Sequence, residues 1–372
     1  MFNDKERGIR HHGLDHLRAL AIVLVFFFHY QIISHGKPEW LPEAARFGWT
    51  GVDLFFVLSG FLISSQLFIQ IKETGTINWK TFIIKRIFRI IPPFLFILAV
   101  YFLVPDFREK EALPPLWRFL TFTQNIGLDI SKTGTFSHAW SLCVEEHFYF
   151  FLPLILLLLL RLRQFQRGMV LLILFLIGTI GVRYLMFHQQ YEPHQLAEDG
   201  WKYWYRLIYY PTWCRLDGLL TGVGIAAVSV FRPEAWKKIT SFGNGWLLTG
   251  LGLLTYAWFL CEDQMNEMAS VWGFTIVAIG HGCLVMAALS PKTLLSRYSS
   301  SLTSFIARVS YDIYLSHKGI IHLTLIYVGM YTVNQNLLLI AGFIFSIFAG
   351  QLLYHFIDKP SAKMKERWLQ RK

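Results

Sequence analysis

Long apolar segments recur along the whole chain, and short polar connections separate them. A helix needs about 20 mainly apolar residues to cross a bilayer. The pattern predicts about ten such helices and leaves little chain for a soluble domain. We expect spans near residues 17–35, 50–71, 90–105, 142–160, 169–187, 213–231, 245–261, 271–289, 309–331 and 337–356.

Composition supports this pattern, because 54% of the 372 residues are hydrophobic and only 16% are charged. Soluble domains carry about 25% charged residues. The four cysteines lie in or beside apolar segments without paired-ligand spacing, which indicates buried small side chains rather than disulfides or zinc ligands. We predict an all-α integral membrane protein, with one transmembrane domain over residues 12–360 and a basic cytoplasmic tail over 361–372.

The net charge of +11 could suggest a nucleic-acid partner, but the distribution of the charges does not favour one. With a cytoplasmic N-terminus, 23 Lys and Arg residues face one side, eight face the other and four lie within spans. Positive residues in short loops favour the cytoplasm, so we expect both termini there and no nucleic acid. The first apolar segment lacks a small-residue cleavage site, and we expect it to be retained. The cytoplasmic cations begin with Lys5, Arg7 and Arg10 and end with Arg371 and Lys372.

Two polar residues, Arg18 and His29, stand eleven positions apart in the first apolar segment. Eleven helical steps place both side chains on one face, about 16 Å apart along the axis. A lone histidine on an apolar helix is more often a buried hydrogen-bonded group than a catalyst. Asp53, in the next span, should lie at nearly the depth of His29. The sequence therefore makes His29 a candidate general base and Asp53 its orienting partner.

Arg86 and Arg89 precede a double proline at the cytoplasmic start of the third span. Taken alone, they fit an ordinary topology anchor. Arg18 is expected at the same depth, however, and neighbouring guanidinium groups repel unless an anion joins them. We therefore predict that Arg18, Arg86 and Arg89 hold a phosphate-bearing ligand on the cytoplasmic side.

Glu145 and Glu146 stand together at the outer edge of the fourth span. Adjacent carboxylates on a helix project about 100° apart, so only one can point squarely into the interior. A pair at the membrane interface is the simpler alternative, yet polar residues this dense in a span usually line a cavity. We expect one of the two to be functional, and the sequence leaves the choice open.

Further polar residues lie in later spans. Tyr311, Tyr314 and His317 cover an arc of about 120° in the ninth span, which fits a polar wall or an interfacial tyrosine pair equally well. Arg215 and Asp217 fit a buried ion pair that holds helices together or a functional site. The outer loop over residues 188–212 is rich in Tyr and Trp, which suit an interfacial aromatic belt better than sugar stacking.

Taken in order, these segments resemble the acyltransferase 3 family of bacterial membrane O-acyltransferases, over nearly the whole chain from about Leu14 to Pro360. Two positions depart from the family pattern. The closing motif usually reads Glu-x-Pro and here begins with Asp358, and Lys318 is not expected directly after His317. Besides Arg18 and His29, the resemblance rests on GVDLFFVLSGFLI at 51–63, KRIFRIIPPF at 85–94, WSLCVEEHFYFFLP at 140–153, RLDGLLTG at 215–222, YDIYLSH at 311–317 and IDKP at 357–360.

The resemblance implies transfer of an acyl group, usually acetyl, from cytoplasmic acyl-CoA to a hydroxyl of a cell-envelope or exported glycan. We expect acyl-CoA, in the simplest case acetyl-CoA, as the donor, with no metal. We expect a glycan or lipid-linked saccharide as acceptor, membrane lipids around the chain and a multi-pass location in the bacterial inner membrane. The catalytic candidates are His29, Asp53, Glu145 and Glu146, and the donor-binding candidates are Arg18, Arg86, Arg89, Tyr311, Tyr314 and His317.

No further domain is expected after the tenth span, so the chain would act alone or pass its acyl group to a partner protein. A transporter or flippase for a polar lipid or saccharide is the main alternative, because intramembrane charges also suit a translocation path. Discontinuous helices and inverted repeats would favour that alternative, and the sequence shows neither convincingly. A scaffold without catalysis would leave Arg18 and His29 unexplained.

Overall fold

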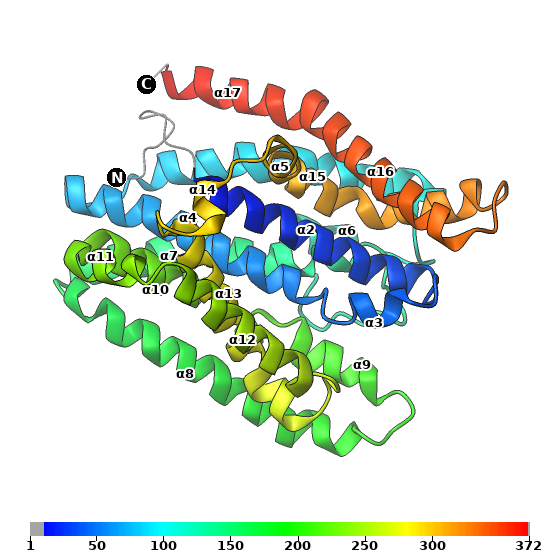
Figure 1. The fold of residues 1–372 in the computed structure, drawn as a ribbon, viewed down its shortest axis with the longest axis horizontal. Helices are drawn as coiled ribbons and strands as arrows, with labels where there is room; N and C mark the ends of the chain where they lie inside the picture. Colours follow the sequence, from blue (N-terminus) through cyan, green and yellow to red (C-terminus); the bar gives the residue numbers. More distant parts are fainter. Residues whose placement is uncertain (1–10, 371–372) are drawn as a thin grey trace. The chain divides into compact units, whose positions relative to one another are not determined.

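The structure, a computed structural model, describes residues 11–370, and these residues form helices, turns and loops without a strand (Figure 1). A helix lies in each of the ten predicted apolar ranges. The expected cations Lys5, Arg7, Arg10, Arg371 and Lys372 lie outside the described residues. The long helices are α2 (His12–Ile33), α4 (Thr50–Thr74), α5 (Trp79–Leu103), α7 (Trp140–Arg161), α8 (Gly168–Met186), α10 (Asp217–Phe231), α12 (Asn244–Leu260), α13 (Phe274–Leu289), α15 (Ser301–Leu323) and α16 (Gln335–Leu353).

Within residues 11–370, seven helical segments are long and apolar enough to cross a membrane, and α10 is apolar but shorter. The fold is therefore a polytopic all-α membrane protein, while the number of spans and the side of the termini stay predictions. Shorter helices connect the long ones. They are α3 (Leu41–Ala45), α6 (Leu116–Leu120), α9 (Gly200–Trp204), α11 (Pro233–Ser241), α14 (Leu294–Arg297) and α17 (Lys359–Gln370).

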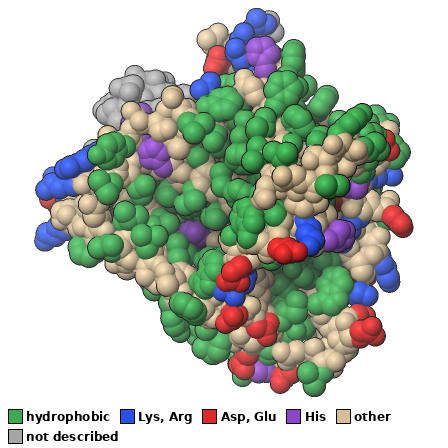
Figure 2. All heavy atoms as spheres, turned by 45° about the vertical axis from the view of Figure 1, so that its right-hand side comes forward, with side chains coloured by type: hydrophobic (Ala, Val, Ile, Leu, Met, Phe, Trp, Pro, Cys, Tyr) green, Lys and Arg blue, Asp and Glu red, His purple; other side chains and the backbone are tan. Residues whose placement is uncertain are grey.

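Large apolar side chains remain exposed on the long helices. Phe150, Phe151 and Leu158 of α7, for example, are between 50% and 55% exposed. Figure 2 shows hydrophobic side chains over much of one face of the molecule. Contiguous exposed apolar surface of this kind marks a surface that another apolar phase covers, which for a chain with these helices is lipid.

The chain divides into two compact units. Unit 1 contains the residues up to Leu17, Val52–Ile77 and Pro114–Ser300, and unit 2 contains Arg18–Gly51, Asn78–Leu113 and Ser301–Lys372. In unit 1, α10 packs against α8 and α13, and α13 packs against α12. In unit 2, α15 packs against α16 and α5, and α17 packs against α5 (Figure 1).

The double proline inside α5 removes backbone hydrogen-bond donors, and a side chain from another helix of unit 2 replaces one of them. Proline has no backbone N–H, so Pro92 cannot donate to the carbonyl of Phe88 one turn earlier. The hydroxyl of Ser361 in α17 donates to that carbonyl at 2.7 Å. The hydroxyl of Tyr311 in α15 donates to the carbonyl of Ile90 at 3.0 Å. Ser361 therefore replaces the hydrogen bond that Pro92 cannot make, and Tyr311 adds a second bond from another helix to the same stretch of α5.

In unit 1, α4 and α10 cross where two glycines face each other. A Cβ at Gly222 would meet the backbone of α4 at Val57, Gly60 and Phe61, and a Cβ at Gly60 would meet the backbone of Leu219. Small residues let membrane helices approach to backbone contact. This close crossing positions the start of α10, where several buried charges lie.

We expect Gly222→Ala to destabilise the protein by about 1–3 kcal/mol, because the added methyl group forces α4 and α10 apart. Thermal unfolding of the purified protein in detergent measures the effect. Gly178→Ala in α8 is the matched control, since a Cβ at Gly178 meets nothing within 4 Å. Equal melting temperatures for the two variants would contradict the close crossing.

Candidate active site

Two histidine rings meet in unit 2, the partly buried His29 of α2 and the buried His317 of α15. The Nδ1 atom of His29 lies 2.9 Å from the Nε2 atom of His317, and the ring centroids are 4.9 Å apart. The Nδ1 atom of His317 lies 2.8 Å from the carbonyl oxygen of Tyr314 and 3.2 Å from that of Ile313. His29 and His317, separated by 288 positions in sequence, thus form an imidazole pair.

The hydrogen-bond network assigns the protons of this pair. A carbonyl oxygen can only accept, so Nδ1 of His317 carries a proton and donates it to Tyr314. In a neutral ring the other nitrogen then accepts, so Nδ1 of His29 is the donor between the rings. A neutral His317 is favoured because its side chain is fully buried and the cation of Lys318 follows it directly. A neutral His29 with its proton on Nδ1 carries its lone pair on Nε2, the atom that would act as a general base.

Apolar side chains on both sides of His29 along α2 are densely packed. Phe26 and Tyr30 of α2 belong to one buried cluster, together with Leu41 and Ala45 of α3, Ile321 of α15 and Leu339 of α16. The ring of Tyr30 lies against Gly342 of α16, where a Cβ would come within 3.3 Å of it. These contacts hold α2, α15 and α16 together in unit 2.

A buried ion pair lies directly beside the imidazole pair. The Nζ atom of Lys318 is 2.7 Å from Oε1 of Glu109, and the two side chains are 7% and 2% exposed. Glu109 follows α5 and carries no motif that sequence reasoning could have used. The lysine that departs from the family pattern is thus compensated by a carboxylate from another segment of unit 2.

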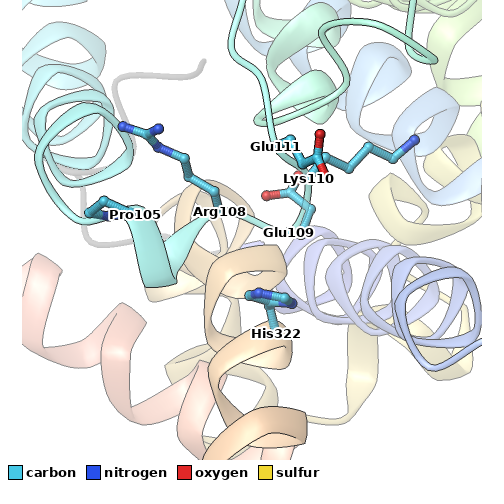
Figure 3. Close-up of a pocket in the computed structure, with 6 residues that line it drawn as sticks. All are labelled: Pro105, Arg108, Glu109, Lys110, Glu111 and His322. Atoms are coloured by element: carbon cyan, nitrogen blue, oxygen red, sulfur yellow. The ribbon is translucent and has the colours of Figure 1, made fainter.

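A hollow of about 450 Å³ opens next to Glu109 (Figure 3). In Figure 3, His322 lies beneath the carboxylates of Glu109 and Glu111, while the side chain of Arg108 points away. Arg108 donates to the carbonyls of Tyr101 and Phe102, each at 2.7 Å. Burial and then repulsion from Lys318 lower the pKa of Lys110 at the edge of this hollow.

The donor-binding candidates all belong to unit 2. Arg89 of α5 donates to Asp358 at 2.9 Å, and its side chain is 47% exposed. Arg18 and Arg86 are partly buried. The buried carboxylate of Asp312 lies within electrostatic range of Arg89 and Asp358. The aspartate that replaces the family's usual glutamate therefore holds one of the three predicted phosphate ligands.

Tyr311 and Tyr314 have different surroundings. Tyr311 donates to α5, as described above, whereas the Tyr314 carbonyl receives the proton of His317 and its ring lies 5.8 Å from that of His317. His317, predicted as a donor-binding residue, contacts the candidate base His29, and its role in donor binding stays a prediction. The sequence showed the polar face that carries His317, but it did not show that His29 is its partner.

The acidic candidates of the fourth span lie in unit 1. Glu145 accepts hydrogen bonds from Ser59 at 3.0 Å and from Tyr149 at 2.9 Å, one on each carboxylate oxygen. Glu146 is partly buried beside it. The role of either residue stays a prediction.

Asp53, the expected orienting partner of His29, lies in unit 1, where both of its carboxylate oxygens accept from Arg215, at 2.9 and 3.0 Å. A buried carboxylate gains more from a guanidinium than from a neutral imidazole. In unit 2, His317 lies against Nδ1 of His29, and a pairing of Asp53 with His29 stays a prediction. The guanidinium of Arg215 also lies over three rings, those of Trp140, Tyr209 and Phe274.

The expected ion pair between Arg215 and Asp217 is wrong. Asp217, at the first turn of α10, pairs instead with Arg183 of α8 and accepts from Thr275 of α13 at 2.5 Å. Arg183 donates further to the carbonyls of Val271 and Cys214. Two interleaved buried ion pairs therefore replace the single local one.

Tyr209 of the aromatic outer loop is buried against Arg215, so it serves neither a lipid interface nor an exposed sugar surface.

Among residues 11–370, no group of three His, Cys, Asp or Glu side chains is arranged to hold a metal ion. The described site is thus one of imidazoles, guanidinium groups and a compensated lysine.

Comparison with known proteins gives one matching family. Residues 11–355 match the model of the family described as acyltransferase domain. A protein of Staphylococcus aureus (strain COL) with a provisional O-acetyltransferase name is 28% identical over 372 residues, covering 94% of this chain and 57% of its own length. The O-acetyltransferase OatA of Staphylococcus aureus (strain NCTC 8325 / PS 47) is 26% identical over 370 residues, with the same two shares.

The chain thus spans little more than half the length of the curated relatives it matches. No solved structure matches the chain.

Proposed function

This chain belongs to the acyltransferase domain family, and from that premise we propose that it is a membrane O-acetyltransferase. The donor in this proposal is cytoplasmic acetyl-CoA, and the acceptor is a hydroxyl of a cell-envelope or exported glycan, free or lipid-linked. The chain lies in the bacterial inner membrane with both termini in the cytoplasm. It either completes the transfer itself or passes the acetyl group to a partner protein.

The observation that carries this proposal is the imidazole pair. The acceptor hydroxyl donates its proton to Nε2 of His29, while the Nδ1 proton of His29 moves to Nε2 of His317. The hydroxyl oxygen forms a bond to the acetyl carbonyl carbon, the carbon–sulfur bond breaks, and the proton returns from the pair to the CoA thiolate. His317 thereby acts as a proton relay and as the positioning residue for His29, the part expected of Asp53.

Acetylation of glycans in cells with and without the chain tests the function. We expect glycan mass spectrometry to find acetyl groups that depend on the chain, and radiolabelled acetyl-CoA to supply them in isolated membranes. Membranes that transport a saccharide without labelling it would instead support the transporter alternative.

Donor binding rests on the arginines of unit 2. Arg18, Arg86 and Arg89 hold the phosphates of acyl-CoA through bidentate hydrogen bonds, and Tyr311 and Tyr314 line the path of its pantetheine arm. Arg89 must exchange Asp358 for a phosphate when the donor binds. Its half-exposed side chain makes this exchange easier than it would be for a buried pair.

We expect the double variant Arg86→Gln/Arg89→Gln to weaken acetyl-CoA binding at least tenfold, because each charge-assisted hydrogen bond contributes about 1.5–3 kcal/mol. Equilibrium binding of radiolabelled acetyl-CoA to the purified protein measures this. Lys85→Gln is the matched control, an exposed cation of the same segment. Asp358→Asn should bind the donor as well as or better than the wild type. If the double variant binds like Lys85→Gln, the two arginines are topology anchors.

A further inference from the structure

A second hollow, of about 660 Å³, lies in unit 2 at the predicted outer side of the membrane. It is formed by the connection from α2 to α3 and by the first turn of α16. No motif of the sequence pointed to it. Its lining residues are Lys37, Pro38, Glu39, Trp40, Gln335 and Asn336.

Trp40 presents a fixed aromatic face in this hollow. Its side chain is 52% exposed, and its indole N–H donates to Oδ1 of Asn336 at 2.9 Å. Asn336 is itself fixed, because the side chain of Asn334 caps α16 and accepts from the backbone N–H groups of Asn336 and Leu337. The indole ring is therefore oriented before any ligand arrives, which lowers the entropy cost of binding.

The hollow has no net charge. Lys37 and Glu39 compensate each other through an ion pair of 3.1 Å, and Gln335 and Asn336 contribute neutral amides. Amide groups both donate and accept hydrogen bonds, as ligand hydroxyls do. An aromatic face beside uncharged donors and acceptors suits a sugar ring, with its apolar C–H face and its rim of hydroxyls, better than an anion or a cation.

The helices that form the hollow share a buried cluster with α2. Leu41 and Ala45 of α3 and Leu339 of α16 belong to the same buried cluster as Phe26 and Tyr30 of α2. Trp40 directly precedes Leu41, and His29 directly precedes Tyr30. The hollow and the candidate base are therefore carried by segments that pack in one buried cluster of unit 2.

We propose that this hollow binds one uncharged sugar residue of the acceptor glycan, with Trp40 stacking on its ring and Gln335 and Asn336 bonding its hydroxyls. The proposal rests on the proposed function for the identity of its ligand. It adds an acceptor subsite that holds the glycan while a neighbouring hydroxyl reaches His29.

Saturation-transfer NMR on the full chain in detergent tests binding without requiring activity. The probes are chitotetraose and maltotetraose. We expect the wild type to transfer saturation to the ring protons of at least one probe, Trp40→Ala to lose it, and Trp40→Phe to restore part of it. Trp117→Ala in unit 1 is the matched control, because Trp117 is similarly exposed, at 58%.

Kinetics separate this proposal from the proposed function. In Trp40→Ala we expect the KM for the oligosaccharide acceptor to rise about tenfold, with the KM for acetyl-CoA unchanged. A wild type that binds a probe through Trp40 but transfers no acetyl group would overturn the function and keep the subsite. A wild type that binds neither probe, or equal binding by Trp40→Ala and Trp117→Ala, would make Trp40 an ordinary interfacial tryptophan and overturn the subsite.

Discussion

We expect replacement of His29 by Ala to lower the rate of acetyl transfer at least a hundredfold, while the protein still folds and still binds acetyl-CoA. A positioned general base contributes about 10²–10⁴ to a rate. Transfer of radiolabelled acetyl groups in membranes measures the rate, and donor binding measures the integrity of the site. His355→Ala is the matched control, an exposed histidine of the same unit.

His317 variants distinguish a relay from a donor ligand. His317→Ala removes the acceptor of the Nδ1 proton of His29, so we expect kcat to fall and its pH profile to change, while acetyl-CoA binding stays near that of the wild type. A donor ligand would instead raise the KM for acetyl-CoA and leave the pH profile unchanged. Wild-type transfer in His29→Ala would end the base assignment altogether.

The largest effect on folding is expected from Asp217→Ala, which leaves the guanidinium of Arg183 buried and unpaired. Breaking a buried ion pair by removing one partner costs about 3–5 kcal/mol, and both side chains here are at most 2% exposed. We expect little folded protein after solubilisation, as measured by size-exclusion chromatography and thermal unfolding.

Two comparisons make this prediction specific. The double variant Arg183→Met/Asp217→Leu removes both charges and should recover part of the folded protein, since apolar replacement of a whole buried pair is often tolerated. Glu234→Ala breaks an exposed pair with Lys237 and should change stability by less than about 1 kcal/mol. If Asp217→Ala melts like Glu234→Ala, the ion pair contributes nothing.

The sequence predicted the helices because apolar runs report directly on burial in lipid. It also singled out His29 and His317, each as a polar group on an apolar helix, but it could not pair them across 288 positions. The sequence placed Asp53 near His29 by depth in the membrane alone, which says nothing about direction around the helix axis, and it did not predict that Asp53 pairs with Arg215. Many residues lie at the same depth in the membrane, and only the packing of the helices determines which of their side chains are in contact.

The partners of the buried charges of unit 1 also could not be predicted from the sequence. Arg215 and Asp217 stand two positions apart, which made a local pair plausible, yet Arg215 precedes α10 and Asp217 begins it. Their side chains therefore reach different helices. Arg183 appeared in the sequence only as one cation within a span, and Glu109 as one charge in a loop. Neither carries a local pattern, because their partners are distant in sequence.

The hydroxyl of Ser361 links the C-terminal segment to α5 through its hydrogen bond to Phe88. A truncation at Pro360 would remove the group that completes the hydrogen bonding of α5, and an uncompensated carbonyl within an apolar protein is costly. Affinity tags and fusion partners for this protein therefore belong after α17. A variant shortened before α17 would report on the stability of the fold, not on whether the C-terminal tail is needed for function.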